Sequence, residues 1–187
     1  IIVGMRNGIS PSAKGKIPGR VLTLSAVTGG EFDPSQAKDA MFSSRPAPNQ
    51  HVRRGHLLIC RGNGNISLVG RAVVAQEDHP GLVIPDTVIG AELDTSQVVP
   101  TYFAAAWQQR STRNQIESSA RTTSGIHKVN QQTLGEVRIP LPPISVQKEF
   151  AERVANVRSF ERRLRAHALS IHAMVASLQS RAFSGRL

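Results

Sequence analysis

Residues 145–183 decide the architecture, and they read SVQKEFAERVANVRSFERRLRAHALSIHAMVASLQSRAF. Ser145 is a residue type that caps helix N-termini, and neither glycine nor proline follows until Gly185. The stretch therefore predicts one helix from residue 146 to 183, about 57 Å long at 1.5 Å per residue. Helices in globular proteins average about 10–14 residues, so a helix of this length extends beyond its own domain.

Apolar residues recur along this helix at alternating steps of four and three. From Phe150 onward nine of ten such positions are apolar, and the exception is Glu161, which we expect to fix the pairing register. A seam sustained over more than four heptads is typical of a helix that pairs with a second helix. The alternative is a core helix that lies across its own domain. We expect the pairing seam to comprise Phe150, Val154, Val157, Leu164, Ile171, Val175 and Leu178.

The preceding residues have a different pattern, with short apolar runs separated by Gly, Pro, Asn and Asp. These runs predict strands at 21–27, 57–61, 68–75, 87–93 and 136–141, with a turn at 62–65. Pro100 opens a helix through Trp107 with Arg110 near its end, and a second helix covers 113–120 before a polar loop at 121–125. The expected fold class is α+β (mixed α/β). We predict a globular domain over 1–144 and a coiled-coil helix domain over 145–187.

The charge balance favours a polyanionic partner. Lys and Arg total 23 against 13 Asp and Glu, which gives a net charge of +10 and a pI near 11.2. Basic chains gain sequence-independent affinity for phosphates by releasing counterions. The one cysteine, Cys60, lies in an apolar run and is expected to be a buried hydrophobe in a reducing cytoplasm. We expect no membrane span or signal peptide, and the first residue, Ile1, suggests that the native start is missing.

No catalytic or metal-binding motif stands out. The glycine-rich turn lacks the third glycine of a dinucleotide loop, the six histidines have no metal spacing, and one cysteine excludes a zinc cluster. Asp86, Glu92 and Asp94 resemble the acids of a metal-dependent nuclease, but the expected lysine is absent. We therefore predict no catalytic residue, no metal and no cofactor in this chain.

Polar residues that suit base and phosphate contacts gather in two stretches of the globular part. Only eight aromatic residues are present, which favours a duplex over single strands that stack on aromatic side chains. Arg, Asn and Gln read bases, whereas Ser, Thr and Lys bind phosphates. The candidate DNA-binding residues are Arg61, Asn63, Asn65, Arg71, Arg113, Arg121, Thr122, Thr123, Ser124 and Lys128.

Several motifs together resemble one family. They are Arg61-Gly62-Asn63-Gly64, Val69-Gly70-Arg71, Pro85-Asp86, Arg121-Thr122-Thr123-Ser124-Gly125-Ile126, Val129-Asn130 and Leu134-Gly135-Glu136-Val137, together with the proline-rich join Ile139–Gln147 and the ending Ser177–Leu187. This succession is similar to the DNA specificity subunits of type I restriction-modification systems. The resemblance covers essentially the whole chain.

The resemblance implies a target recognition domain that reads one half-site of a bipartite sequence in double-stranded DNA. It also implies a spacer helix that pairs with a second copy or second half of the subunit. Methyltransferase and endonuclease subunits would be the other partners, and they would carry S-adenosylmethionine, ATP and Mg. Specificity subunits usually have two recognition domains and two long helices, whereas this chain has one of each, so it is either a fragment or a half-subunit that dimerises.

Two other functions stay open on the residues alone. The chain could be a dimerising scaffold whose basic charge is incidental, in which case its DNA binding would have a negligible salt dependence. It could also be a nuclease that uses Asp86, Glu92 and Asp94 with a divalent ion. Metal-dependent nicking that is lost in Asp86→Ala would be required for that function.

Overall fold

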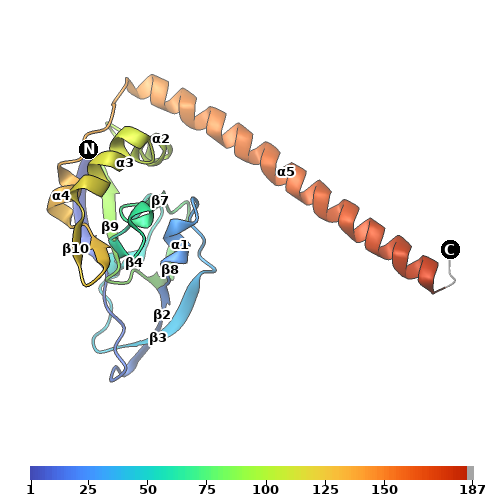
Figure 1. The fold of residues 1–187 in the computed structure, drawn as a ribbon, viewed down its shortest axis with the longest axis horizontal. Coiled ribbons are helices and arrows are strands. Elements are labelled where there is room, and N and C mark those ends of the chain that lie inside the picture. The colour runs from blue at the N-terminus through green and yellow to red at the C-terminus, as the bar shows by residue number, and fades with distance from the viewer. Residues whose placement is uncertain (185–187) are drawn as a thin grey trace. The chain divides into compact units, whose positions relative to one another are not determined.

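The computed structural model describes residues 1–184 and their side chains, except the side chain of Thr123. The chain divides into two compact units, Ile1–Ile144 and Ser145–Leu187, which we call the globular unit and the helical unit. Figure 1 shows the mixed α+β structure of the first unit and the single helix of the second, which confirms the predicted fold class.

Within residues 1–184 the strands form three sheets. The first has the order β1-β9-β5-β7 and comprises Ile2–Asn7, Val88–Leu93, Leu57–Cys60 and Ala72–Val74. The second has the order β3-β2-β8-β4 and comprises Ala37–Phe42, Ile17–Leu22, His79–Val83 and His51–Val52. The third has the order β10-β11-β6 and comprises Arg121–Thr123, Ile126–Lys128 and Gly62–Asn63. Helices of the globular unit are α1 Ser25–Thr28, α2 Pro100–Trp107, α3 Arg110–Ser119 and α4 Gln131–Gly135, with short 3-10 turns at Pro48–Gln50 and Ile66–Leu68.

The first sheet is the centre of the globular unit, and its two faces belong to different cores. Leu57 and Ile59 of β5 pack with residues of α2, α3 and α4, whereas Leu58 packs with residues of β2, β8 and α1. Side chains of a strand alternate between faces, so this strand is apolar throughout because both faces are buried. Cys60 ends the strand, and burial raises the pKa of its thiol to about 11, as expected for a buried hydrophobe.

The predicted strand at 21–27 is wrong in its second half. Strand β2 ends at Leu22, and residues from Ser25 form the short helix α1. The Thr23 hydroxyl lies 2.7 Å from the Ser25 hydroxyl and donates to the Gln36 carbonyl at 3.0 Å, which holds the chain in the turn. Ala26 and Val27 are fully buried on α1. A short apolar run does not distinguish a strand from a buried helical turn.

The predicted strand at 68–75 is shorter than expected, because Gly70 interrupts it. Gly70 has φ +69°, and a Cβ there would lie 2.3 Å from Cγ2 of Ile116. Its carbonyl accepts a hydrogen bond from the Trp107 indole at 2.8 Å, which fixes the crossing of α2 over this turn. Trp107 and Phe103 are buried and stacked, with ring centroids 5.2 Å apart.

The helix that begins at Pro100 is confirmed, but it ends at Trp107 and Arg110 begins α3 instead of lying near the end of α2. The polar loop predicted at 121–125 is also wrong, since residues Arg121–Thr123 form strand β10.

The strand predicted at 136–141 is absent from the described chain. Val137 and Ile139 still pack against the first core, but a side chain takes the place of a neighbouring strand. The Gln115 amide accepts from the backbone N–H of Arg138 and donates to its carbonyl, both at 2.9 Å. The two backbone groups that a strand partner would satisfy are therefore satisfied by one glutamine.

The helical unit contains helix α5, which runs over Ile144–Phe183 and begins two residues before the predicted start. At 1.5 Å per residue its 40 residues span about 60 Å. None of the helices within residues 1–184 combines the length and the apolar composition that a membrane span requires.

Candidate nucleic-acid interface

A tight hairpin carries half of the predicted DNA-binding residues on its two strands and its turn. Thr123 pairs with Ile126, so only Ser124 and Gly125 form the turn. Their φ values are +50° and +76°, the combination that a type I′ hairpin turn requires at both central positions. Ser124 is the only non-glycine residue at positive φ among residues 1–184. The positive φ of Ser124 is therefore a local backbone strain, and it allows a two-residue turn to connect the two paired strands.

The structure joins the two predicted polar stretches in one small sheet. Strand β11 pairs with β10 on one side and with β6 on the other, so Lys128 lies opposite Arg121 and also opposite Gly62. Gly62 leaves room for the neighbouring strand, because a Cβ there would lie 3.0 Å from Cγ of Lys128 and 3.2 Å from the carbonyl oxygen of His127. We call the sheet β10-β11-β6 the polar ribbon.

The polar ribbon is anchored at its base to the central core. The backbone N–H of Val129 donates to the Arg61 carbonyl at 2.9 Å, and the N–H of Arg61 donates to the Thr87 carbonyl at 2.9 Å. Val129 is 3% exposed and belongs to the first core. The side chains of the ribbon are mostly exposed. The ribbon is therefore held in place by the buried Val129 after β11 and by the hydrogen bond from Arg61 to Thr87 beside β9.

The two faces of the polar ribbon carry different chemistry. Arg121 and Lys128 are directly opposite one another and so share a face, both are exposed, and neither forms an ion pair with the described residues. Like charges placed opposite one another repel, which favours an anion over this face. Thr122 and His127 share the other face, where the Thr122 hydroxyl lies 2.9 Å from Nδ1 of His127. Sequence analysis missed His127, because its place in the ribbon depends on the register of β11.

The remaining predicted residues of the ribbon lie at its turns. Ser124 is exposed at the hairpin tip, and the side chain of Thr123 lies outside the described residues. The carboxamide oxygen of Asn63 accepts from the Asn65 N–H at 2.9 Å, and that of Asn65 accepts from the Ser67 N–H at 3.0 Å. Both asparagines therefore shape the turn after β6 through their oxygens.

Three predicted arginines are committed to backbone carbonyls of the globular unit. Arg61 donates to the Asp86 carbonyl at 3.2 Å, and Arg71 donates to the carbonyls of Ser67 and Thr28 at 3.1 and 3.0 Å. The Arg113 side chain is 11% exposed and donates to the Val69 carbonyl at 2.6 Å and to Glu117 at 3.1 Å. Their roles as DNA contacts stay predictions, and the uncommitted guanidinium on the ribbon belongs to Arg121.

The three acids of the nuclease alternative do not converge. Glu92 is paired with Arg6, and the hydrogen bond from Arg6 holds the pKa of this carboxyl below its ordinary value. Asp94 accepts from Ser96 and from Gln97 at 2.6 Å, and the Ser96 hydrogen bond lowers the pKa of its carboxyl. Within residues 1–184 no three His, Cys, Asp or Glu side chains are placed to hold a metal ion.

A buried histidine lies next to the Arg6–Glu92 pair. His56 is 4% exposed, its Nδ1 accepts from the Arg53 backbone N–H at 3.3 Å, and its Nε2 lies 3.5 Å from the Arg6 guanidinium and 3.8 Å from Glu92. Burial, followed by the charge of Arg6, lowers the pKa of His56 below its ordinary value. Both effects favour the neutral form of the ring inside the globular unit.

The predicted seam of the helical unit is largely uncovered. Phe150 and Val154 are half-buried, whereas the later seam residues are exposed. The exposed fractions lie between 46% and 59% for Val157, Leu164, Ile171, Val175 and Leu178. An apolar stripe on an exposed helix is typical of a surface that packs against another element, and its pairing with a second helix stays a prediction.

Comparisons with known proteins agree with the resemblance found in the sequence. No family model matches the chain. The chain is 26% identical to the type I restriction enzyme EcoKI specificity subunit of Escherichia coli (strain K12), across 100% of this chain and 41% of that protein. It is 22% identical to the type I restriction enzyme StySPI specificity subunit of Salmonella potsdam, across 78% of this chain and 32% of that protein. The chain therefore spans less than half of the length of these relatives.

Solved structures show the same fold. The HsdS subunit from Thermoanaerobacter tengcongensis superposes with a TM-score of 0.60 at 19% identity, over 90% of this chain and 43% of that chain. A chain from a structural study of complex assembly in the type I R-M system superposes with a TM-score of 0.58 at 18% identity, over 98% of this chain and 44% of that chain.

Proposed function

We propose that this chain, a relative of the type I restriction enzyme specificity subunits, recognises one half-site of a bipartite sequence in double-stranded DNA. The observation that carries the proposal is the polar ribbon, since it brings Arg121, Lys128 and the Gly62–Asn63 strand into one exposed sheet. Its β10–β11 hairpin is two-stranded, and a two-stranded β-ribbon fits the major groove of B-DNA, where each base pair presents a distinct pattern of donors and acceptors.

The side chains of the ribbon suit this role. Arg121 has an exposed guanidinium with no ion pair to the described residues, and such a group pairs with O6 and N7 of guanine. Lys128 beside it is a donor to the same groove or to a phosphate. The bond between Thr122 and His127 fixes the opposite face, so the ribbon enters the groove as a pre-organised unit.

The helical unit fits the second part of the role. Its uncovered seam would pair with the corresponding helix of a second copy or of a second half of the subunit, and so set the distance between two half-sites. In this proposal the methyltransferase and endonuclease subunits assemble with the pair and act on DNA in the cytoplasm. These partners perform the chemistry and bind S-adenosylmethionine, ATP and Mg, whereas this chain is not catalytic.

Selection from a pool of random-sequence duplexes tests the proposed function. The purified full chain, bound to the pool at about 0.15 M salt and recovered over several rounds, is expected to enrich a short motif. If no motif is enriched and all duplexes bind with equal affinity, sequence recognition is refuted. Metal-dependent nicking of the recovered DNA by the purified chain would refute the non-catalytic role.

A further inference from the structure

The positive charge of the globular unit is concentrated away from the polar ribbon. Residues 1–144 hold 15 basic and 10 acidic residues, a net charge of +5. Residues 8–20 and 37–46, which form the loop before β2, strands β2 and β3, and the loop after β3, contribute a net charge of +4. Their charged residues are Lys14, Lys16, Arg20, Lys38, Arg45 and Asp39. We call these two segments the basic arm, and Figure 1 shows it directed, like the tip of the β10–β11 hairpin, toward the lower end of the globular unit.

The loop of the basic arm is fastened in place by its backbone. A Cβ on Gly8 would lie 2.1 Å from the carbonyl oxygens of Ile84 and Pro85, and a Cβ on Gly15 would lie 2.5 Å from the backbone of Phe42. The loop is also hydrogen-bonded to the end of β3. The bonds are Ser12 N–H to the Met41 carbonyl at 2.8 Å and Lys16 N–H to the Phe42 carbonyl at 3.1 Å. The loop therefore presents its side chains from a fixed frame.

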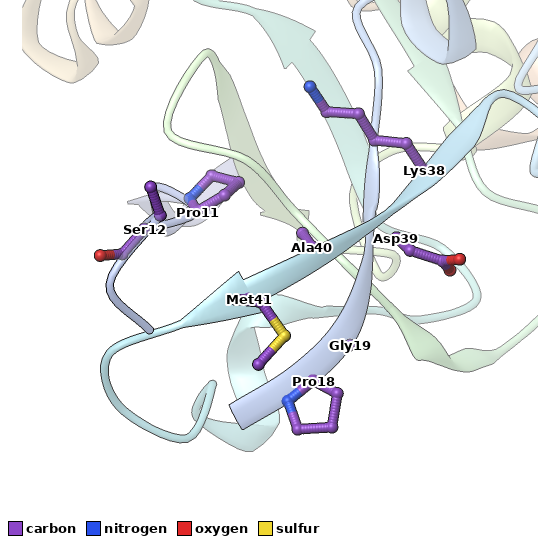
Figure 2. A pocket seen from close by; sticks show the side chains of 9 residues that line it. Pro11, Ser12, Pro18, Gly19, Lys38, Asp39, Ala40 and Met41 are labelled. Carbon is purple, nitrogen blue, oxygen red and sulfur yellow. The ribbon is translucent and has the colours of Figure 1, made fainter. Parts of the chain in front are cut away.

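A shallow hollow of about 730 Å³ separates this loop from β2 and β3. Pro11 and Ser12 line it from the loop, and Pro18 and Met41 line it from the strands (Figure 2). Lys38 also lines the hollow, and its side chain extends away from Met41 and Pro18 in this view. Lys14 and Lys16 are exposed on the loop beyond the hollow. The arm thus combines a largely apolar hollow, which Lys38 and Asp39 also line, with exposed lysines on the neighbouring loop.

The residue types of the loop favour phosphate binding over base reading. Base edges are read mainly by Arg, Asn and Gln, and none of these occurs between Gly8 and Lys16. The polar residues of that stretch are Ser10, Ser12, Lys14 and Lys16. Serine hydroxyls, lysine ammonium groups and backbone N–H groups are the usual donors to phosphate oxygens. Asp39 offsets one of the five positive charges of the arm, and its contact with Arg20 is a weak surface pair, 3.9 Å long, with an Asp39 side chain that is 96% exposed.

We infer that the basic arm is a second DNA-binding surface, one that grips the phosphate backbone of the duplex while the polar ribbon reads its bases. The inference rests on the proposed function, since it assigns the arm to the same duplex. Lys14 and Lys16 make the principal phosphate contacts and Lys38 adds to them. The arm supplies affinity and register and carries no base preference.

Salt dependence of binding tests the inference. The variant Lys14→Ala/Lys16→Ala is compared with the intact full chain by fluorescence anisotropy, on the selected half-site duplex and on a scrambled duplex, between about 0.05 and 0.3 M salt. Loss of two phosphate contacts should reduce the slope of log K against log salt by about 1.8 and weaken binding at least about tenfold at 0.1 M salt. Both duplexes should lose the same factor, so the ratio of their affinities should not change.

The control is Arg110→Ala/Arg138→Ala, which removes two exposed charges of the globular unit outside the arm and the ribbon. An equal loss in the control and in the arm variant would show a general charge effect and would overturn the inference. An unchanged slope in the arm variant would also overturn it, and so would a changed affinity ratio, since the arm would then read bases. If the intact chain shows no preference between the two duplexes, the proposed function fails, whatever the arm variant does to the slope.

Discussion

Replacement of Gln115 separates a structural role from a DNA-reading role. Glutamine on an exposed helix of a DNA-binding protein is a standard reader of adenine. In this chain both ends of the Gln115 amide are bound to the backbone of Arg138, at 2.9 Å each, and its NH₂ also approaches the Ser111 carbonyl at 3.3 Å. The amide holds the segment of Val137 and Ile139 against the first core. We therefore expect Gln115→Ala to act on stability.

The magnitude follows from the two hydrogen bonds that are lost. A neutral hydrogen bond contributes about 0.5–1.5 kcal/mol net, and water can reach the freed groups of Arg138 because the site is exposed. Gln115→Ala should therefore lower the free energy of unfolding by about 1–2 kcal/mol. For a unit of this size that corresponds to a fall in Tm of about 2–8 °C.

The assay is thermal unfolding by circular dichroism, together with the DNA selection described above. Gln132→Ala is the matched control, because Gln132 is exposed on α4 and its loss should leave Tm within about 1 °C. The selected motif should be the same for all three proteins. A Gln115→Ala variant that keeps its Tm but no longer distinguishes one base would refute the reasoning.

Three further predictions concern the turn, the buried histidine and the seam. Ser124→Gly should raise the free energy of unfolding by about 0.5–1 kcal/mol, because glycine relieves the positive φ of +50°; a loss of stability in denaturant titration would contradict the turn geometry. The lowered pKa of His56 means that the unfolded chain binds a proton that the folded chain excludes, so stability should fall as pH drops below about 6.5, by up to about 1.4 kcal/mol per pH unit. This loss should be weaker in His56→Gln, and a Tm that rises on acidification would refute the assignment. Leu164→Arg or Ile171→Arg should reduce the mass measured by light scattering to that of a single chain, with the globular unit still folded, whereas Arg165→Ala should not.

The long helix and the central strand could be predicted from the sequence because each depends on a local pattern. The heptad seam from Phe150 and the absence of Gly and Pro predict α5 to within two residues of its start. The run Leu57–Cys60 predicts a strand, and the fully buried β5 is the result.

The polar ribbon could be predicted only in part, because its assembly depends on contacts distant in the sequence. Both polar stretches were identified, but β6 has two residues, and its pairing with β11 depends on the bond between Val129 and Arg61. The strand expected at 136–141 fails for a related reason. Its alternating apolar residues do pack, yet Gln115 satisfies the backbone groups that would otherwise seek a strand. A glutamine side chain that takes the place of a neighbouring strand leaves no pattern in the nearby sequence from which it could be predicted.

The most direct test of the central role of the polar ribbon is the affinity of Arg121→Ala for the selected half-site and for all of its single-base variants. The ribbon geometry predicts a loss of about 1–3 kcal/mol on the selected duplex and a flattened preference at one base position, with the other positions still discriminated. Arg138→Ala, which removes an exposed arginine outside the ribbon, should leave the preference at every position unchanged. A loss that is the same on every duplex would contradict base reading by Arg121 and reduce the ribbon to a phosphate contact.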